Sequence, residues 1–163
     1  MSKVFVITGG SDGMGKAIAR RLGQQGALLL ADVSEERLQA AIEKLAVEGI
    51  TDVSSQVVDN TKKEQVEALA AAAARLRELG AIVHTAGLSP TMGSGRRIME
   101  VNMVGTGLIL KAFLPLAVPG SVAHGSSDAG YARRFAGAAA ITTRGFHRWK
   151  PLLVIQHSRI QVS

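Results

Sequence analysis

A glycine-rich segment near the start of the chain, from Thr8 to Gly15, has the residue types and spacing of a phosphate-binding loop. It reads Thr-Gly-Gly-Ser-Asp-Gly-Met-Gly and lies between an apolar run and a helical pattern. Gly9 permits a tight turn, Gly13 lets the backbone approach a pyrophosphate, and Gly15 lets the following helix pack close to a sheet. The free N–H groups at the start of that helix would then face the phosphates. The loop residues expected to bind them are Gly9, Ser11, Asp12, Gly13, Met14 and Gly15.

A carboxylate follows this loop by about 20 residues, at the end of the next apolar run. Asp32, with Val33 after it, is placed to accept hydrogen bonds from both hydroxyls of the adenosine ribose of a dinucleotide. Its charge would repel the 2′-phosphate of NADP, and the sequence places no arginine beside it to offset that repulsion. The loop and Asp32 together predict NAD as the cofactor, in preference to NADP. The alternative interpretation is a cluster of turn glycines followed by a helix-capping aspartate.

The elements that must position these residues alternate between short β-branched runs and longer helical patterns. Such alternation is typical of stacked βαβ units. The predicted strands are Val4–Thr8, Ala27–Ala31, Val53–Val58, Ala81–His84 and Gly120–Gly125. The predicted helices are Met14–Gln25, one between Ser34 and Gly49, one from Thr61 to Leu79, and one long or two short helices over Arg96–Ala117. We therefore expect an α/β fold: a Rossmann-type doubly wound parallel sheet in three αβα layers, incomplete at its C-terminal edge.

The ends of these elements carry their own signals. Gly26 is expected to end the first helix as a C-cap glycine, and Thr-Lys-Lys-Glu from Thr61 is expected to open the third as a capping box. Beyond residue 130 the pattern is ambiguous. It fits a helix over Tyr131–Ile141, and both Leu152–Ile155 and Arg159–Val162 fit a sixth strand at the sheet edge.

The net charge of +6 is confined to the last part of the chain. Residues 1–128 hold 13 basic and 13 acidic side chains, whereas residues 129–163 hold six basic side chains and no acidic one. This break predicts a dinucleotide-binding domain over residues 1–130 and an atypical basic segment over residues 131–163. The segment has three interpretations: a surface segment of the same domain, a basic patch for nucleic acid, or a tail from a shifted reading frame. The nucleic-acid interpretation rests on charge alone.

Several classes of protein are not expected. The first residues turn polar too soon for a signal peptide, and the most apolar stretch, residues 98–118, is interrupted by charged residues and a proline, which favours an amphipathic helix over a membrane span. The chain has no cysteine, and its four histidines lack metal-ligand spacing, so we expect no metal site. The absence of cysteine suits a reducing compartment. The sequence therefore predicts a cytoplasmic protein without a membrane partner.

Motifs in the first 130 residues resemble those of the short-chain dehydrogenase/reductase family. The loop matches the family pattern Thr-Gly-x-x-x-Gly-x-Gly, and His84-Thr85-Ala86-Gly87 is similar to its Asn-Asn-Ala-Gly element, with both asparagines replaced. The resemblance implies that Asp59 binds the adenine amino group, with Asn60 beside it. It also implies that the backbone of Thr85, Ala86 and Gly87 lies against the adenosine ribose.

The resemblance also carries catalytic residues, in part. Asn102 is similar to the family asparagine that holds a helix bend and a proton-relay water, and Ser127 matches the catalytic serine that hydrogen-bonds the substrate oxygen. The family's proton donor is a tyrosine, four residues before a lysine that lowers its pKa. At the family's spacing from the serine this chain has Ala140, and then Arg144. The only tyrosine, Tyr131, is the remaining candidate.

Two functions follow from this resemblance. The first is an NAD-dependent oxidoreductase that transfers hydride between NAD(H) and an alcohol or carbonyl substrate, impaired in this chain by the missing Tyr-x-x-x-Lys pair. The second is a non-catalytic NAD-binding or oligomerising remnant of the family. The helix over Asn102–Leu116 corresponds to the family's usual pairing surface, so a homo-oligomer is expected.

Overall fold

The structure, a computed structural model, describes residues 2–119, 121–125 and 139–142. Its centre is a sheet with strand order β3-β2-β1-β4-β5-β6. The strands are β1 (Val4–Thr8), β2 (Ala27–Asp32), β3 (Val53–Val57), β4 (Leu79–His84), β5 (Val122–Gly125) and β6 (Ala139–Thr142). Strands β1 to β5 are parallel, and β6 runs antiparallel to β5. The chain winds outward in both directions from the β1–β4 pair, which confirms the predicted doubly wound α/β fold.

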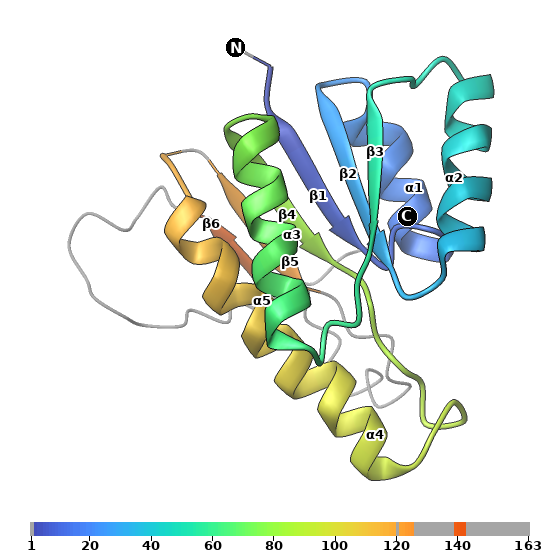
Figure 1. Ribbon diagram of the computed structural model, residues 1–163, viewed down its shortest axis with the longest axis vertical. Coiled ribbons are helices and arrows are strands. Elements are labelled where there is room, and N and C mark those ends of the chain that lie inside the picture. Colours follow the sequence, from blue (N-terminus) through green and yellow to red (C-terminus); the bar gives the residue numbers. More distant parts are fainter. Residues whose placement is uncertain (1, 120, 126–138, 143–163) are drawn as a thin grey trace, which may run out of the picture.

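Helices cover both faces of this sheet (Figure 1), because parallel strands are joined by crossovers that lie on the faces. They are α1 (Gly13–Leu22), α2 (Glu35–Val47), α3 (Lys63–Leu76), α4 (Gly95–Met99) and α5 (Gly105–Phe113). A π-helical turn, Glu100–Val104, joins α4 to α5, and a 3-10 turn, Leu114–Leu116, follows α5. Helices α1 and α2 pack on one face, and α3 and α5 pack on the other. These are the predicted three layers.

The sheet divides the core into two apolar clusters. Ile7 of β1 packs with Leu38 on the side of α1 and α2, whereas Val6 packs with Leu69 and Phe113 on the side of α3 and α5. All five side chains are buried. Neighbouring residues of β1 face opposite clusters because successive side chains of a strand alternate between the two faces. Burial on both faces is why β1 and β2 are continuous apolar runs in the sequence.

The predicted helix over 96–117 is continuous from Gly95 to Leu116 and contains the π turn. Its length and its mean hydropathy of 1.3 would suffice, by composition alone, for a membrane-spanning helix. Ile109 and Phe113 are nevertheless buried against the sheet, where α5 contacts α3 and β4. The α4 end extends past the edge of the sheet (Figure 1).

The end of α1 differs from the prediction. The helix ends at Leu22, and its cap is Gly23, whose N–H donates to the Ala19 carbonyl at 2.8 Å. The C-cap role expected of Gly26 is therefore wrong. A Cβ at Gly26 would lie 2.5 Å from the carbonyl oxygen of Lys3, so this glycine allows the chain to pass close to the start of β1.

The predicted capping box of the third helix is also wrong. Helix α3 begins after Lys62, which makes no side-chain cap hydrogen bond. The hydroxyl of Thr61 instead donates to the carboxylate of Asp59 at 2.7 Å, because that acceptor lies two residues away and outcompetes the helix N–H groups. The helix ends at Leu76 rather than at Leu79, since Leu79 begins β4 and pairs with β1.

The sixth strand is β6, which pairs Ala139 with Gly125. The helix expected over Tyr131–Ile141 is therefore wrong for residues 139–141, where pairing with β5 decides the local structure. Residues 131–138, Leu152–Ile155 and Arg159–Val162 lie outside the described residues. The domain boundary near residue 130 stays a prediction.

Candidate functional site

The glycine loop connects the end of β1 to the start of α1, at the carboxyl edge of the parallel strands. Gly9 has a φ of +67° and Gly13 a φ of +49°, both in the left-handed region that favours glycine. Asp12 caps α1, and its Oδ1 accepts a hydrogen bond from the Gly13 N–H at 2.7 Å. A Cβ at Gly13 would meet no atom within 4 Å. The loop is therefore open on this side, where the positive end of the α1 dipole can receive an anion.

Gly9 and Gly15, in contrast to Gly13, have no room for a side chain. A Cβ on Gly15 would overlap the carbonyl oxygen of Gly9, and a Cβ on Gly9 would lie 2.8 Å from the Ala86 nitrogen. Thr85 closes this contact, because its N–H and its hydroxyl both donate to the carbonyl oxygen of Thr8, at 3.0 and 2.7 Å. The segment after β4 and the glycine loop therefore pack backbone to backbone. Only glycine at both positions permits this approach.

Asp32 ends β2 beside the glycine loop, with its side chain 10% exposed. Its Oδ2 accepts a hydrogen bond from the Ser11 hydroxyl at 2.5 Å, and its Oδ1 accepts one from the Ser34 N–H at 3.3 Å. A third donor is Arg37 of α2, whose Nη2 lies 2.9 Å from Oδ1. The expectation that no arginine stands beside Asp32 is therefore wrong. The first turn of α2 brings Arg37, five residues further along the chain, back to this carboxylate.

Asp59 lies one residue beyond Val58, whose N–H donates to the carbonyl oxygen of Asp32 at 2.9 Å. Its Oδ1 accepts hydrogen bonds from the N–H and hydroxyl of Thr61, and its Oδ2 lies 3.4 Å from Nη2 of Arg97. Burial by itself would raise the pKa of Asp59, but the bonds from Thr61 and the Arg97 charge together lower it. Asp59 is therefore charged at neutral pH. Both acids of the predicted adenosine site thus carry an arginine partner.

Val33 and Asn60, the residues that follow these two acids, differ in exposure. Val33 is 60% exposed and offers apolar surface at this edge of the sheet. Asn60 is buried, and its Nδ2 donates to the Val101 carbonyl oxygen at 3.1 Å. A Cβ on Gly105 would overlap the Asn60 side chain. Asn60 therefore joins the end of β3 to the π turn, and its amide is engaged within the protein.

His84 is the last residue of β4, and its hydrogen-bond partner could not be predicted from the sequence. It is 4% exposed, and its Nδ1 lies 2.5 Å from the hydroxyl oxygen of Thr8. Its Nε2 has no hydrogen-bond partner within the part of the chain that the structure describes. Burial lowers the pKa of His84 to about 4, so the imidazole is neutral at pH 7. The only signal in the sequence was its replacement of an asparagine in the family's element.

Asn102 lies in the π turn between α4 and α5. Its Oδ1 accepts a hydrogen bond from the Leu88 N–H at 2.8 Å, and its Nδ2 donates to the Leu88 carbonyl oxygen at 2.9 Å. The Thr106 hydroxyl donates to the Asn102 carbonyl oxygen at 2.7 Å. These bonds fasten the π turn to the segment that leaves β4. Such turns inside helices occur frequently at functional sites.

The remaining catalytic candidates, Ser127 and Tyr131, lie outside the described residues. Ala140, at the position expected for the family's tyrosine, lies on β6 and pairs with His124 of β5. No group of three metal-ligating side chains occurs within residues 2–119, 121–125 and 139–142. The described part of the site therefore comprises the predicted cofactor residues and Asn102.

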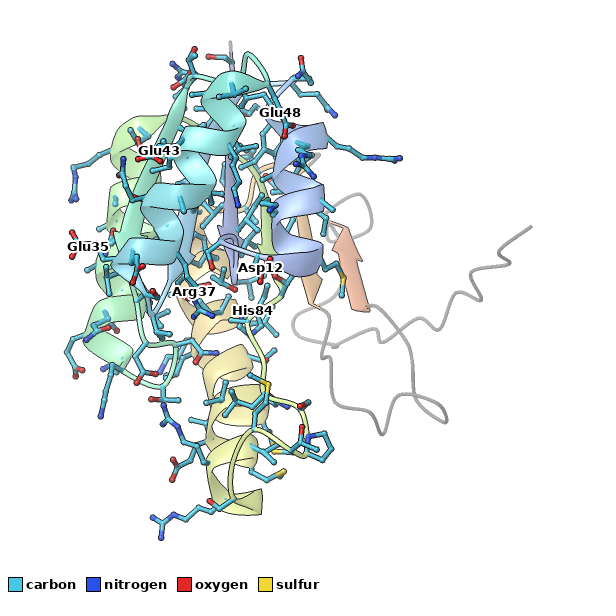
Figure 2. All side chains as sticks on the ribbon, turned by 90° about the vertical axis from the view of Figure 1, so that its right-hand side faces the viewer. Asp12, Glu35, Arg37, Glu43, Glu48 and His84 are labelled. Carbon is cyan, nitrogen blue, oxygen red and sulfur yellow. The ribbon has the colours of Figure 1, made fainter. Side chains whose placement is uncertain are left out.

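The structure brings these residues to one edge of the sheet. The glycine loop, Asp32, Asp59 and Thr85 follow the carboxyl ends of β1, β2, β3 and β4. Figure 2 shows Asp12, Arg37 and His84 toward this end of the sheet and Glu48 at the opposite end. In open α/β sheets, ligands bind outside the carboxyl ends of the strands at the point where the strand order reverses. The β1–β4 pair is that point here.

Comparison with known proteins finds similar sequences in one family. The family model for short chain dehydrogenase matches residues 3–143. A short-chain dehydrogenase/reductase of Alternaria brassicicola is 35% identical over 137 residues, which are 80% of this chain and 48% of that protein. A dehydrogenase/reductase SDR family member of Bos taurus is 33% identical over 143 residues, which are 80% of this chain and 51% of that protein. The chain spans about half the length of these curated relatives.

Solved structures share the fold. An alcohol dehydrogenase of Thermococcus sibiricus, complexed with 5-hydroxy-NADP, is 35% identical with a TM-score of 0.61, over 69% of this chain and 52% of that one. A short chain dehydrogenase/reductase of Burkholderia phymatum, in complex with NAD, is 29% identical with a TM-score of 0.62, over 77% of this chain and 48% of that one.

Proposed function

Since the chain belongs to the short-chain dehydrogenase/reductase family, we propose that it binds NAD and transfers a hydride between NAD(H) and an alcohol or carbonyl substrate. The observation that carries this proposal is the close packing of the glycine loop against the Thr85–Ala86 backbone. That packing leaves Gly13 open at the α1 N-terminus, where the pyrophosphate would bind. The residues that would hold the phosphates are Gly9, Ser11, Asp12, Gly13, Met14 and Gly15.

The adenosine half of the cofactor would lie along the ends of β2 and β3. Asp32 would accept hydrogen bonds from the ribose hydroxyls, and Asp59, held in its charged form, would accept one from the adenine amino group. Val33 would give the ring an apolar surface. The carboxylate of Asp32 favours NAD over NADP, because a 2′-phosphate would approach a like charge. The similar solved structures include a complex with NAD and complexes with NADPH, NADP and 5-hydroxy-NADP.

The proposed catalytic residues are Ser127, Asn102 and Tyr131. Asn102 supports the reaction by holding the π turn against the backbone of Leu88. Ser127 would hydrogen-bond the substrate oxygen, and Tyr131 would exchange the proton with it. No lysine follows Tyr131 at the family's spacing, so the sequence lacks the residue that would lower the pKa of the phenol, and turnover would be impaired. The alternative function, a non-catalytic NAD-binding or oligomerising remnant of the family, rests on the same absence in the sequence.

We also propose that the helix over Asn102–Leu116 pairs with a second copy of the chain. Met103, Val104 and Leu114 are 63%, 53% and 50% exposed along it. A groove of about 270 Å³ runs beside this helix, between α3 and α5, and Leu108 and Ala112 line it. Sedimentation equilibrium tests the proposal, and a monomer at every concentration up to the millimolar range would contradict it.

Calorimetric titration of the full chain with NAD and with NADP tests the proposed cofactor. We expect NAD to bind in the micromolar range and NADP to bind more weakly. A hydride-transfer assay over a panel of secondary alcohols and ketones then separates the enzyme from the non-catalytic alternative. NAD binding without turnover on any substrate would support the alternative. Binding of neither cofactor would contradict the oxidoreductase and the NAD-binding remnant, and would leave only the oligomerising remnant.

A further inference from the structure

Arg37 forms an ion pair with Asp32, the carboxylate that is proposed to bind the cofactor ribose. It comes from the first turn of α2, and its Nη2 lies 2.9 Å from Oδ1 of Asp32. The arginine side chain is 54% exposed, whereas that of Asp32 is 10% exposed. The ion pair is therefore formed by a fixed, enclosed carboxylate and a long side chain that can move into solvent.

The acceptor capacity of Asp32 is nearly filled by the protein itself. An ionised carboxylate has about four lone-pair sites. Three donors of the protein already occupy the two oxygens of Asp32: the Ser11 hydroxyl, the Ser34 N–H and the Arg37 guanidinium. A ribose that donates two hydrogen bonds must displace at least one of them. Ser11 is 7% exposed and Ser34 donates from its backbone, so Arg37 is the donor that is free to swing aside.

We propose that Arg37 sets the discrimination between NAD and NADP, an inference that rests on the proposed function. Displaced from Asp32, the guanidinium stays within reach of the 2′ position of the ribose. There it offsets the charge of the carboxylate and forms charge-assisted hydrogen bonds to a 2′-phosphate. The same arginine competes with the unphosphorylated ribose for Oδ1 of Asp32. Arg37 therefore weakens the preference for NAD that Asp32 alone would impose.

The first turn of α2 also carries acidic side chains, and the Glu35 side chain faces away from the glycine loop (Figure 2). Glu35 and Glu36 are both exposed in this turn. Figure 2 shows Glu35 on the side of α2 away from Asp12, and Arg37 on the side toward it. The cation on this turn is thus the side chain directed toward the glycine loop.

The test compares two adenine nucleotides that differ only in the 2′-phosphate, 5′-AMP and adenosine 2′,5′-bisphosphate. Both are titrated calorimetrically into the full chain, at low and at high salt. For the wild type we expect dissociation constants within about tenfold of each other. In Arg37→Gln the bisphosphate should bind about tenfold more weakly, with a flatter salt dependence, while AMP binds equally well or more tightly. Arg37→Lys keeps the charge but not the planar guanidinium. Its affinity for the bisphosphate should therefore lie between those of the wild type and Arg37→Gln.

Arg20→Gln is the matched control. Arg20 forms an ion pair with Glu48, with nitrogen–oxygen distances of 2.6 to 2.9 Å, at the other end of α1 and α2. The two arginine side chains are similarly exposed, at 44% and 54%, although Glu48 is more exposed than Asp32. Its loss should leave the ratio of the two affinities unchanged.

The outcomes separate the two proposals. If AMP binds but the ratio in Arg37→Gln and Arg37→Lys matches that of the wild type, the role of Arg37 is overturned and the cofactor site stands. If neither nucleotide binds the wild-type chain, the proposed function is overturned and the inference with it. Circular dichroism melting of each variant confirms that a loss of binding is not a loss of fold.

Discussion

The hydroxyl oxygen of Thr8 lies 2.5 Å from Nδ1 of His84, so the last residues of β1 and β4 are joined by their side chains as well as by the sheet. The two residues are paired in the register of these strands. They stand where the strand order reverses, next to the glycine loop and the Thr85 backbone. The contact therefore fixes the two strand ends that flank the proposed cofactor site.

We predict that the free energy of unfolding decreases in mild acid because of His84. Burial lowers its pKa from 6.5 to about 4 in the folded chain, so the unfolded chain binds the extra proton between these values. Its contribution is fully present above pH 6.5 and is lost as the pH falls toward 4. From pH 7.5 to pH 5 the folded state should lose about 2 kcal/mol through this residue.

The measurement is urea unfolding of the wild type and of His84→Asn at both pH values. Asparagine keeps a hydrogen-bonding group beside Thr8 and does not titrate. The difference between the two free energies of unfolding should change by about 2 kcal/mol between the two pH values. A constant difference would show that His84 is not the titrating group.

We predict that Gly15→Ala damages both the fold and cofactor binding. The new Cβ would overlap the carbonyl oxygen of Gly9, and the backbone must move to relieve the clash. Unfolding should become easier by about 1–3 kcal/mol, and NAD binding should be lost. The control is Gly107→Ala, since a Cβ at this glycine of α5 meets nothing within 4 Å. That change should stabilise the chain by up to about 1 kcal/mol and leave NAD binding unchanged. Equal effects at both positions would contradict the close packing.

We predict that Asn102→Ala releases the segment after β4 from the π turn. Both hydrogen bonds to the backbone of Leu88 are lost, at a cost of about 1–3 kcal/mol in the free energy of unfolding. Hydrogen exchange at the Leu88 amide should accelerate more than exchange at β1 amides. Asn102→Asp keeps the acceptor for the Leu88 N–H, so it should retain most of the protection at that amide. Unchanged exchange at Leu88 in Asn102→Ala would contradict the role assigned to this asparagine.

We predict that any hydride transfer by this chain depends on Ser127 and Tyr131. Ser127→Ala removes the proposed hydrogen bond to the substrate oxygen, and Tyr131→Phe removes the proposed proton donor. Each should lower kcat by about 100-fold or more while the affinity for NAD stays the same. Turnover that survives Ser127→Ala would argue against the family mechanism. Turnover that survives Tyr131→Phe alone would remove that tyrosine from the reaction.

Much of the fold could be predicted from the sequence because its causes are local. The continuous apolar runs of β1 and β2 record burial on both faces. The spacing of Gly9, Gly13 and Gly15 indicates a turn with positive φ followed by the start of a helix. The errors fell where two signals competed over a few residues. The Thr61 hydroxyl could bond either the Asp59 carboxylate or an N–H group at the start of α3. Leu79 is compatible with the end of a helix and with the start of a strand.

The sequence by itself determined the order of the elements, the doubly wound sheet and the position of the glycine loop, since periodicity and glycine conformation act over a few neighbouring residues. Tertiary structure decided which distant side chains meet. It placed Arg97 on Asp59 and Thr8 on His84. Such contacts depend on how a helix turn or a strand end is set against the rest of the sheet. Packing of the whole chain fixes that geometry, and no local pattern encodes it.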